Sequence, residues 1–132
     1  MARTPDDLRY SRDHLWTRLT NGASIIRVGI TDSAQESLGD VVDVTLPKLG
    51  ETITAGQACG DMESVKSVSD LIAPVTGTVR TRNEDLASTP GLINSDPYGL
   101  GWMFEAEADS ASLDRQHGEL MDARAYRDLT GA

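Results

Sequence analysis

The chain has 132 residues, of which 39% are hydrophobic and 25% are charged, and its formal net charge is −9. This length and composition predict one soluble globular domain with its own core. The negative charge excludes nucleic acid as an expected partner, because its phosphates would repel the surface. No apolar run approaches the roughly 20 residues of a membrane span, and the charged segment 1–12 has no apolar region typical of a secretory signal.

The first predicted elements are two strands, His14–Thr20 and Ser24–Ile30. They flank Asn21-Gly22, which indicates a tight hairpin because both residues tolerate positive φ. A short helix is expected over 32–38, with Asp32 as its cap and a glycine at its end. The next strand is expected at 41–46. The apolar side chains that alternate along it are Val42, Val44 and Leu46.

Two further strands, at 57–62 and 68–72, are bounded by Gly56 and Pro74. Between them the segment 64–67 is expected to form the turn of a hairpin. A turn tip exposes its side chains and lifts them clear of the body of the domain. The tip is therefore a good place for a residue that another enzyme has to reach.

The side chain at this tip is Lys66, one of only two lysines among the twelve basic residues of the chain. The other lysine is Lys48, and the remaining ten basic residues are arginines. Arginine is always charged, whereas lysine can lose its proton and react with acyl groups. A chain that otherwise uses arginine but places a lysine between small polar residues indicates that the amine is needed for chemistry.

The last third is expected to contain a strand at 78–82, a loop rich in Asn, Ser, Pro and Gly through Gly101, and a strand at 102–108. A C-terminal helix follows from Ser112, and Gly118 is a candidate break in it. Cys59 lies in a predicted strand and is expected to be a small buried residue. No metal site is expected, since the chain has only two histidines, and His14 is interpreted as a partly buried turn residue.

Several motifs resemble those of the glycine cleavage system H-protein family over roughly residues 9 to 130. The lysine region carries the most specific match, and shorter motifs occur on both sides of it. They are Glu63-Ser64-Val65-Lys66-Ser67-Val68-Ser69-Asp70-Leu71, Ala73-Pro74-Val75-Thr76-Gly77-Thr78-Val79, His14 with Trp16, 28–32, 34–35, 38–40, 46–47 with Gly50, Asn94-Ser95-Asp96-Pro97-Tyr98, 101–102 and 120–123 with Tyr126. Biotin carriers and the lipoyl domains of 2-oxo acid dehydrogenases match less well at the tip.

The resemblance implies a mainly β fold, a flattened barrel-sandwich hybrid of the lipoyl/biotinyl carrier type. It would contain the short helix near 32–38 and a C-terminal helix. One lipoyl-carrier domain would span residues 1–132, with an N-terminal segment at 1–12, a β core at 13–108 that holds the lipoyl hairpin near 57–72, and a C-terminal helical segment at 109–132. The two tryptophans, at 16 and 102, are expected to pack in the core or at its rim.

The resemblance also implies a function. Lys66 would carry lipoic acid through an amide, and the chain would be a carrier subunit without catalysis of its own, in the cytoplasm. Its partners would be a pyridoxal-phosphate glycine decarboxylase, a folate-dependent aminomethyltransferase, a dihydrolipoamide dehydrogenase and a lipoylating enzyme. Residues expected to aid recognition or to contact the arm are Glu63, Ser64, Val65, Ser67 and Asp70.

One departure from the family pattern concerns Leu15, because the family usually has a glutamate between the residues that match His14 and Trp16. An acid there would help to hold a cationic amine, and Asp70 remains available near Lys66. Two alternative functions stay open. The chain could serve as a lipoyl donor or relay for other carrier proteins, which requires the same attachment site, or as an unmodified interaction module.

Overall fold

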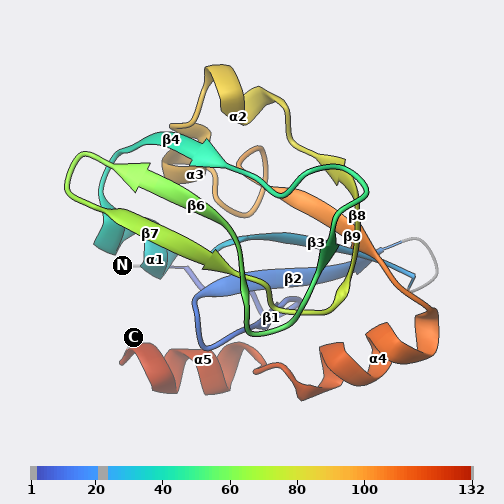
Figure 1. The fold of residues 1–132 in the computed structure, drawn as a ribbon. Helices are drawn as coiled ribbons and strands as arrows, with labels where there is room; N and C mark the ends of the chain where they lie inside the picture. Colours follow the sequence, from blue (N-terminus) through green and yellow to red (C-terminus); the bar gives the residue numbers. More distant parts are fainter. Residues whose placement is uncertain (1–2, 21–23, 132) are drawn as a thin grey trace.

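A computed structural model describes residues 3–20 and 24–131, so the predicted Asn21-Gly22 turn lies outside the described residues. The strands form two antiparallel sheets (Figure 1). The elements, in chain order, are β1 Arg9–Tyr10, β2 Leu15–Thr20, β3 Ile25–Ile30, α1 Asp32–Leu38, β4 Val41–Thr45, β5 Thr52–Ile53, β6 Ala58–Ser64, β7 Val68–Ile72, β8 Gly77–Arg82, α2 Asp85–Ser88, α3 Leu92–Ser95, β9 Phe104–Glu107, α4 Ser110–Glu119 and α5 Ala123–Thr130.

The larger sheet has six strands in the order β1-β2-β3-β9-β8-β5, and the smaller has three in the order β4-β6-β7. A common hydrophobic core lies between them, because alternate side chains of each strand point to one face. Fully buried members from the larger sheet include Ile26, Val79 and Phe104, and Leu71 comes from the smaller sheet. This architecture agrees with the expected mainly β fold, although the described strands form no closed barrel.

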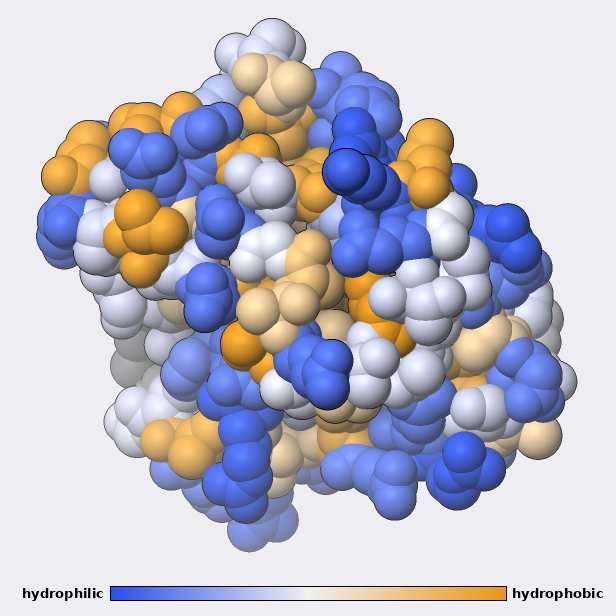
Figure 2. Space-filling model, in the orientation of Figure 1, coloured by the Kyte–Doolittle hydropathy of each residue, from blue (hydrophilic) through white to orange (hydrophobic). Residues whose placement is uncertain are grey.

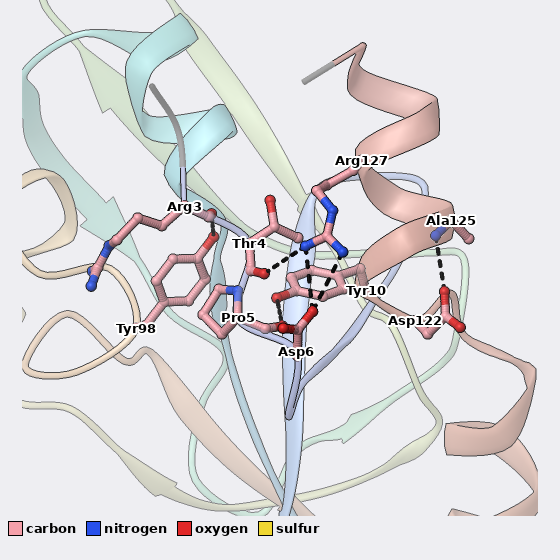
Figure 3. A network of polar contacts seen from close by, with 9 residues as sticks. All are labelled: Arg3, Thr4, Pro5, Asp6, Tyr10, Tyr98, Asp122, Ala125 and Arg127. Carbon is pink, nitrogen blue, oxygen red and sulfur yellow. Dashed lines mark hydrogen bonds and ion pairs between the residues drawn. The ribbon is translucent and has the colours of Figure 1, made fainter.

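A second buried cluster fixes the two ends of the described chain to the larger sheet. The rings of Tyr10 on β1 and Tyr126 on α5 stack with centroids 4.7 Å apart. Around them, Arg127 donates to the carbonyl oxygen of Thr4 and contacts the Asp6 carboxylate (Figure 3). The C-terminal helical segment thus packs against the N-terminal segment, which was not evident in the sequence.

The C-terminal helix is divided in two, and the expected break at Gly118 is wrong. Helix α4 passes through Gly118 and ends at Glu119. The interruption comes at Met121, whose backbone exchanges hydrogen bonds of 2.8 and 2.9 Å with Tyr10. Asp122 then caps α5 by accepting from the Ala125 N–H. Pairing with a distant strand, rather than a glycine, ends the first helix.

Three further expectations need correction. Helix α1 has the predicted bounds, but its cap is Thr31, whose side chain accepts from the Ala34 N–H, and not Asp32. Val42 is 49% exposed, because the register of β4 against β6 shifts beside it. The predicted loop before Gly101 contains α2 and α3, one-turn helices that are too short for a readable periodicity. No helix in the described part of the chain is long and apolar enough to cross a membrane.

Candidate functional site

The expected lysine hairpin is present, formed by β6 and β7 with Lys66 at its tip. In Figure 1 this tip projects beside α1, away from the C-terminal helices. The Lys66 side chain is exposed. It forms no hydrogen bond or ion pair with any residue that the structure describes. The amine is therefore accessible, and no intramolecular partner has to be displaced before it reacts.

Ser64 fixes the shape of the turn. Its Oγ accepts from the backbone N–H groups of Lys66 and Ser67, both at 3.2 Å, and its own N–H donates to the Ser67 carbonyl at 2.8 Å. Such side-chain bonds to the backbone stabilise tight turns. The prediction that Ser64 is exposed is wrong, since it is buried with 6% exposure. It supports the tip from below and is not presented to a partner.

Replacing Ser64 with alanine is expected to lower the free energy of unfolding by about 1 kcal/mol, because two part-buried backbone N–H groups lose their acceptor. Ser67→Ala is the matched control, since the Ser67 side chain is exposed and forms no hydrogen bond in the described structure. It should stay within about 0.5 kcal/mol of wild type. Urea denaturation and amide exchange at Lys66 would measure both. Equal stabilities would show that the Ser64 hydroxyl does not hold the turn.

The tip is also held by the segment that follows α1. The Val65 N–H donates to the Asp40 carbonyl at 3.1 Å. The Lys66 stem lies over Gly39, where an added Cβ would be only 3.1 Å from Lys66 Cε. Gly39 ends the helix with φ +78°, a conformation that favours glycine. The same residue therefore closes α1 and leaves room for the lysine stem.

Asn94 on α3 connects these pieces. Its side-chain amide donates to the Gly39 carbonyl at 2.8 Å and to Gln35 Oε1 at 3.1 Å. Its Oδ1 accepts from the Val41 N–H at 2.9 Å. One side chain thus joins the end of α1, the start of β4 and, through them, the hairpin tip. Asn94 was part of the sequence motif, but its role depends on contacts across more than fifty residues and was missed.

A cavity of about 210 Å³ opens beside the hairpin. It is smaller than the roughly 300–1,000 Å³ of typical pockets for free ligands. Its apolar and polar walls come from β2 and the turn before it, and from β3, α1, β6 and β7. The lining residues are Asp13, His14, Leu15, Ile30, Ser33, Ala34, Ser37, Leu38, Met62, Ser69 and Asp70.

Leu15 and His14 form one side of this cavity. Leu15 is only 2% exposed and belongs to both the core and the cavity wall, as expected of apolar cover. His14 is half-buried in a turn, with φ +68°. Its Nδ1 lies 2.7 Å from the hydroxyl of Tyr126, which is in turn 2.7 Å from Thr31 Oγ1. Burial raises the pKa of Tyr126, so the hydroxyl stays protonated and α5 fixes the imidazole.

Unpaired acids line the outer face of the smaller sheet. Asp43 is opposite Glu63, and Asp61 is opposite Asp70. Like charges in directly opposed positions destabilise a sheet, and none of the four forms an ion pair with a residue that the structure describes. Apolar side chains gather at the adjoining tip (Figure 2), where Val65 is 67% exposed. This face therefore carries more negative charge and more exposed apolar surface than the stability of the fold requires.

The remaining expected residues take ordinary places. Cys59 on β6 is half-buried, and burial raises the pKa of its thiol to about 11, so it stays protonated. Trp16 is fully buried and donates from Nε1 to the Pro97 carbonyl at 2.9 Å. Trp102 is half-buried at the rim, beneath the guanidinium of Arg27 at 4.3 Å. The tryptophan prediction is confirmed, and the cysteine is less buried than expected.

The structure brings most of the predicted site residues together. Glu63, Val65 and Ser67 are exposed around Lys66, whereas Asp70 lies farther along β7 at the cavity. Sequence reasoning did not identify Asp13 as a cavity residue. Its position just before the His-x-Trp motif was the available signal, but a turn residue that has no predicted contacts does not reveal where it lies.

Two packed β-sheets with an exposed lysine at a hairpin tip are the arrangement of a lipoyl-carrier domain. Residues 8–131 match the family model described as glycine cleavage H-protein. The chain is 54% identical over 127 residues to a glycine cleavage system H protein of Mycolicibacterium gilvum, with 96% of each chain covered. It is 52% identical over 128 residues to one of Mycobacterium avium, again with 96% of each covered.

A solved structure agrees with these sequence matches. The chain is similar to the crystal structure of a glycine cleavage system H protein from Mycobacterium marinum, with a TM-score of 0.86 and 41% identity over 97% of this chain and 99% of that one. This chain therefore belongs to the glycine cleavage H-protein family. The resemblance seen in the motifs and the expected carrier fold are both confirmed.

Proposed function

We propose that this chain is lipoylated on Lys66 and is the shuttle of the glycine cleavage system. It carries the aminomethyl group from the pyridoxal-phosphate glycine decarboxylase to the folate-dependent aminomethyltransferase, and then electrons to dihydrolipoamide dehydrogenase. The observation that carries the proposal is the exposed, unpartnered lysine on a turn fixed by Ser64 and Asp40. Membership of the glycine cleavage H-protein family supports this choice of the attached group and of the partners.

The residues around Lys66 fit a lipoyl group. The stem already lies over Gly39, next to Leu38 in the cavity wall. Apolar side chains such as Leu15, Ile30 and Met62 suit the methylenes and the ring of the arm, and Asp70 suits a cationic amine. When bound, the lipoyl group supplies sulfur atoms that hold the one-carbon amine and then electrons. The cavity walls would keep water from that cargo.

The acidic face of the smaller sheet supports a role among several enzymes. Complementary charges accelerate encounter between proteins more than they add affinity. The exposed valine beside Lys66 would then enter each active site together with the arm. A tethered arm raises the effective concentration of its cargo wherever the tip docks. The described residues hold no group of three or more metal-binding side chains. We assign the chain a carrier role without catalysis of its own, in the cytoplasm.

The test combines intact mass with glycine-dependent exchange. The chain would be co-expressed with a lipoylating enzyme, and its mass measured. The lipoylated form would then be mixed with the decarboxylase, glycine and labelled bicarbonate. We expect a mass increase of one lipoyl group, and label in glycine only with the lipoylated chain. A chain that is never lipoylated would leave the interaction module as the better description.

A lipoyl relay uses the same attachment site, and no structural observation favours it over the shuttle. The two functions differ in the step after lipoylation. A shuttle accepts the aminomethyl group from the decarboxylase, whereas a relay passes its lipoyl group through a transferase to other carriers. Lipoylated chain that is inert in the glycine exchange, yet serves as a lipoyl donor, would support the relay.

Recognition by the lipoylating enzyme is expected to depend on Glu63. The side chain is exposed, next to the turn, and opposite Asp43, so it contributes nothing evident to stability. Glu63→Ala should therefore slow lipoylation several-fold, while the free energy of unfolding changes by less than about 0.5 kcal/mol. Glu119→Ala, an exposed glutamate on α4, is the control. A large drop in the thermal midpoint of Glu63→Ala would instead make Glu63 a structural residue.

A further inference from the structure

Two arginines lie directly opposite each other on the larger sheet. Arg18 on β2 pairs with Arg27 on β3, and Arg27 pairs in turn with Glu105 on β9. The residues next to them along these strands, Leu19 and Val28, pack into the core. Because side chains alternate between the two faces of a sheet, both arginines point away from the core. In Figure 1 the smaller sheet lies in front of the larger one, so the arginine pair and the lysine hairpin are on opposite sides of the core.

Two indole rings orient the guanidinium groups of this pair. The guanidinium carbon of Arg18 lies 5.6 Å from the centroid of the Trp16 ring, and that of Arg27 lies 4.3 Å from the centroid of the Trp102 ring. Arg27 also donates from Nε to the Glu105 carboxylate at 2.9 Å. A guanidinium is attracted to an aromatic ring through its planar face, so the N–H groups at its edge remain able to donate. Both side chains are therefore oriented before any ligand binds.

The charges of this pair are not neutralised within the fold. Like charges in directly opposed positions destabilise a sheet. Glu105 accompanies Arg27, but Arg18 forms no hydrogen bond or ion pair with any residue in the described ranges 3–20 and 24–131. The chain has 21 acidic residues and only 12 basic ones, so a neutral or acidic residue opposite Arg27 would suit stability better. The outer face of the larger sheet thus carries an uncompensated positive charge, although the net charge of the chain is −9.

Both arginines can be reached from outside the chain. Arg18 is half-buried, and the Arg27 side chain keeps 33% exposure. Neither Nη atom of Arg27 donates to a residue that the structure describes. The planar guanidinium matches the two oxygens of a carboxylate, and such charge-assisted contacts are among the stronger hydrogen bonds. The free donors therefore suit carboxylates that approach from solvent.

The shape of this surface favours a peptide over a small anion. Sites for small molecules are concave, whereas the arginine pair stands on the open face of a sheet, and the three main cavities are lined by other residues. An extended acidic segment can lay several carboxylates across such a face. The unpaired acids on the smaller sheet repel the same segment, so charge complementarity directs it to the larger sheet.

We propose that Arg18 and Arg27 bind an acidic segment of a partner protein on the outer face of the larger sheet. Carboxylates of that segment accept from the free guanidinium donors, and the half-buried Trp102 ring provides apolar contact beside them. Lys66 is on the other side of the core, so the hairpin tip stays free while the segment is bound. Under the proposed function, this contact would keep the carrier near a partner and raise the effective concentration of the tip. The surface itself does not depend on lipoylation.

The first experiment uses the unlipoylated full chain and a hexaglutamate peptide, acetylated and amidated at its ends, as the probe. NMR would follow the backbone amides of Arg18, Arg27 and Val28 and the indole N–H of Trp102. We expect saturable shifts with hexaglutamate and none with hexaglutamine, the neutral control. Inorganic phosphate at matched ionic strength tests for a small anion. Saturation by phosphate at an equal or lower concentration would overturn the acidic segment in favour of a small-anion site.

Substitution of each arginine tests the pair. Arg18→Gln and Arg27→Gln should each weaken the affinity for hexaglutamate about two- to fivefold, the range of partly exposed charge contacts. Arg18→Lys should recover only part of the loss, because an ammonium keeps the charge but not the planar guanidinium. Arg124→Gln is the matched control, since Arg124 is an exposed arginine on α5, and it should bind like wild type. Wild-type affinity in Arg18→Gln would overturn the paired site.

Thermal unfolding of the same samples separates binding from stability. Arg27→Gln leaves Glu105 without its partner, whereas Arg18→Gln removes no described ion pair and relieves a like-charge contact. Arg18→Gln should therefore unfold within about 3 °C of wild type. A larger fall would make Arg18 a structural cover of Trp16 and contradict the proposal.

Two further outcomes test the location and the nature of the contact. The backbone amides of Val65 and Lys66 should not shift with hexaglutamate. Shifts there that saturate with the peptide would place it on the free lysine of the hairpin and overturn the site on the larger sheet. In about 1 M salt, where the Debye length falls to about 3 Å, wild type should bind no more tightly than a variant that lacks both arginines. Affinity that is unchanged by salt would contradict a contact between charges.

Discussion

Lys66→Arg is expected to abolish lipoylation while leaving the domain folded. Arginine keeps the positive charge, but its guanidinium stays protonated and offers no usable amine for an acyl group. The side chain is exposed and unpartnered in the described structure, so the free energy of unfolding should change by less than about 0.5 kcal/mol. Intact mass after co-expression with a lipoylating enzyme, and thermal unfolding, would measure both.

The chain provides a matched control in Lys48→Arg. Lys48 is also exposed, but it lies in the loop between β4 and β5. There its N–H donates to Glu51 Oε1, and no symmetric hairpin presents its amine. Lipoylation of Lys48→Arg should equal that of wild type. Peptide mapping that placed the lipoyl group on Lys48, or on the α-amino group, would contradict the assignment of the site.

The hairpin could be predicted from local sequence because its determinants are local. Gly56 and Pro74 bound the two strands, and their spacing leaves only a short turn for Lys66. The structure confirms β7 at 68–72 and extends β6 to Ser64. Helix α1 was predicted with its observed bounds for a similar reason, since Gly39 must end it with positive φ. Elements whose start and end signals lie within the same short segment can therefore be predicted from the sequence.

The features that were missed depend on distant contacts. Met121 ends α4 because it pairs with Tyr10, more than a hundred residues earlier. The N-terminal strand β1 has only two residues and exists through its pairing with β2. Neither leaves a periodic pattern, since two residues are too few to show one. The hydrophobic pattern therefore predicted the central strands of the sheets. It did not predict the edge strand β1 or the pairing of Met121 with Tyr10.

The candidate site was predictable only in part, for the same reason. The attachment lysine follows from its turn and from the motif around it. The cavity, by contrast, is built from five separate elements, and no single stretch of sequence encodes it. Ser64 illustrates the difference, because its position in the turn was predicted correctly, whereas its burial was not predicted. Burial there depends on how the tip rests against Asp40 and Gly39.

Outside the hairpin, the largest expected loss of stability comes from Gly29→Ala. Gly29 on β3 is buried directly opposite Trp16 on β2. An added Cβ would lie 2.6 Å from atoms of the indole ring, closer than side chains can approach. The ring cannot move freely, because it is fully buried and its Nε1 is bonded to the Pro97 carbonyl. Overpacking of this kind typically costs about 1–3 kcal/mol.

We therefore expect Gly29→Ala to lower the free energy of unfolding by about 2–3 kcal/mol, which corresponds to a fall in the thermal midpoint of roughly 6–12 °C. Gly118→Ala is the opposite control. Gly118 lies within α4, is exposed, and has no heavy atom within 4 Å of an added Cβ. Alanine there should stabilise the chain by about 0.5 kcal/mol, because glycine is a poor helix former. Thermal unfolding followed by near-ultraviolet circular dichroism reports both stability and indole packing. If Gly29→Ala unfolded within about 1 °C of wild type with unchanged indole signals, the close contact between β2 and β3 at Trp16 would be disproved.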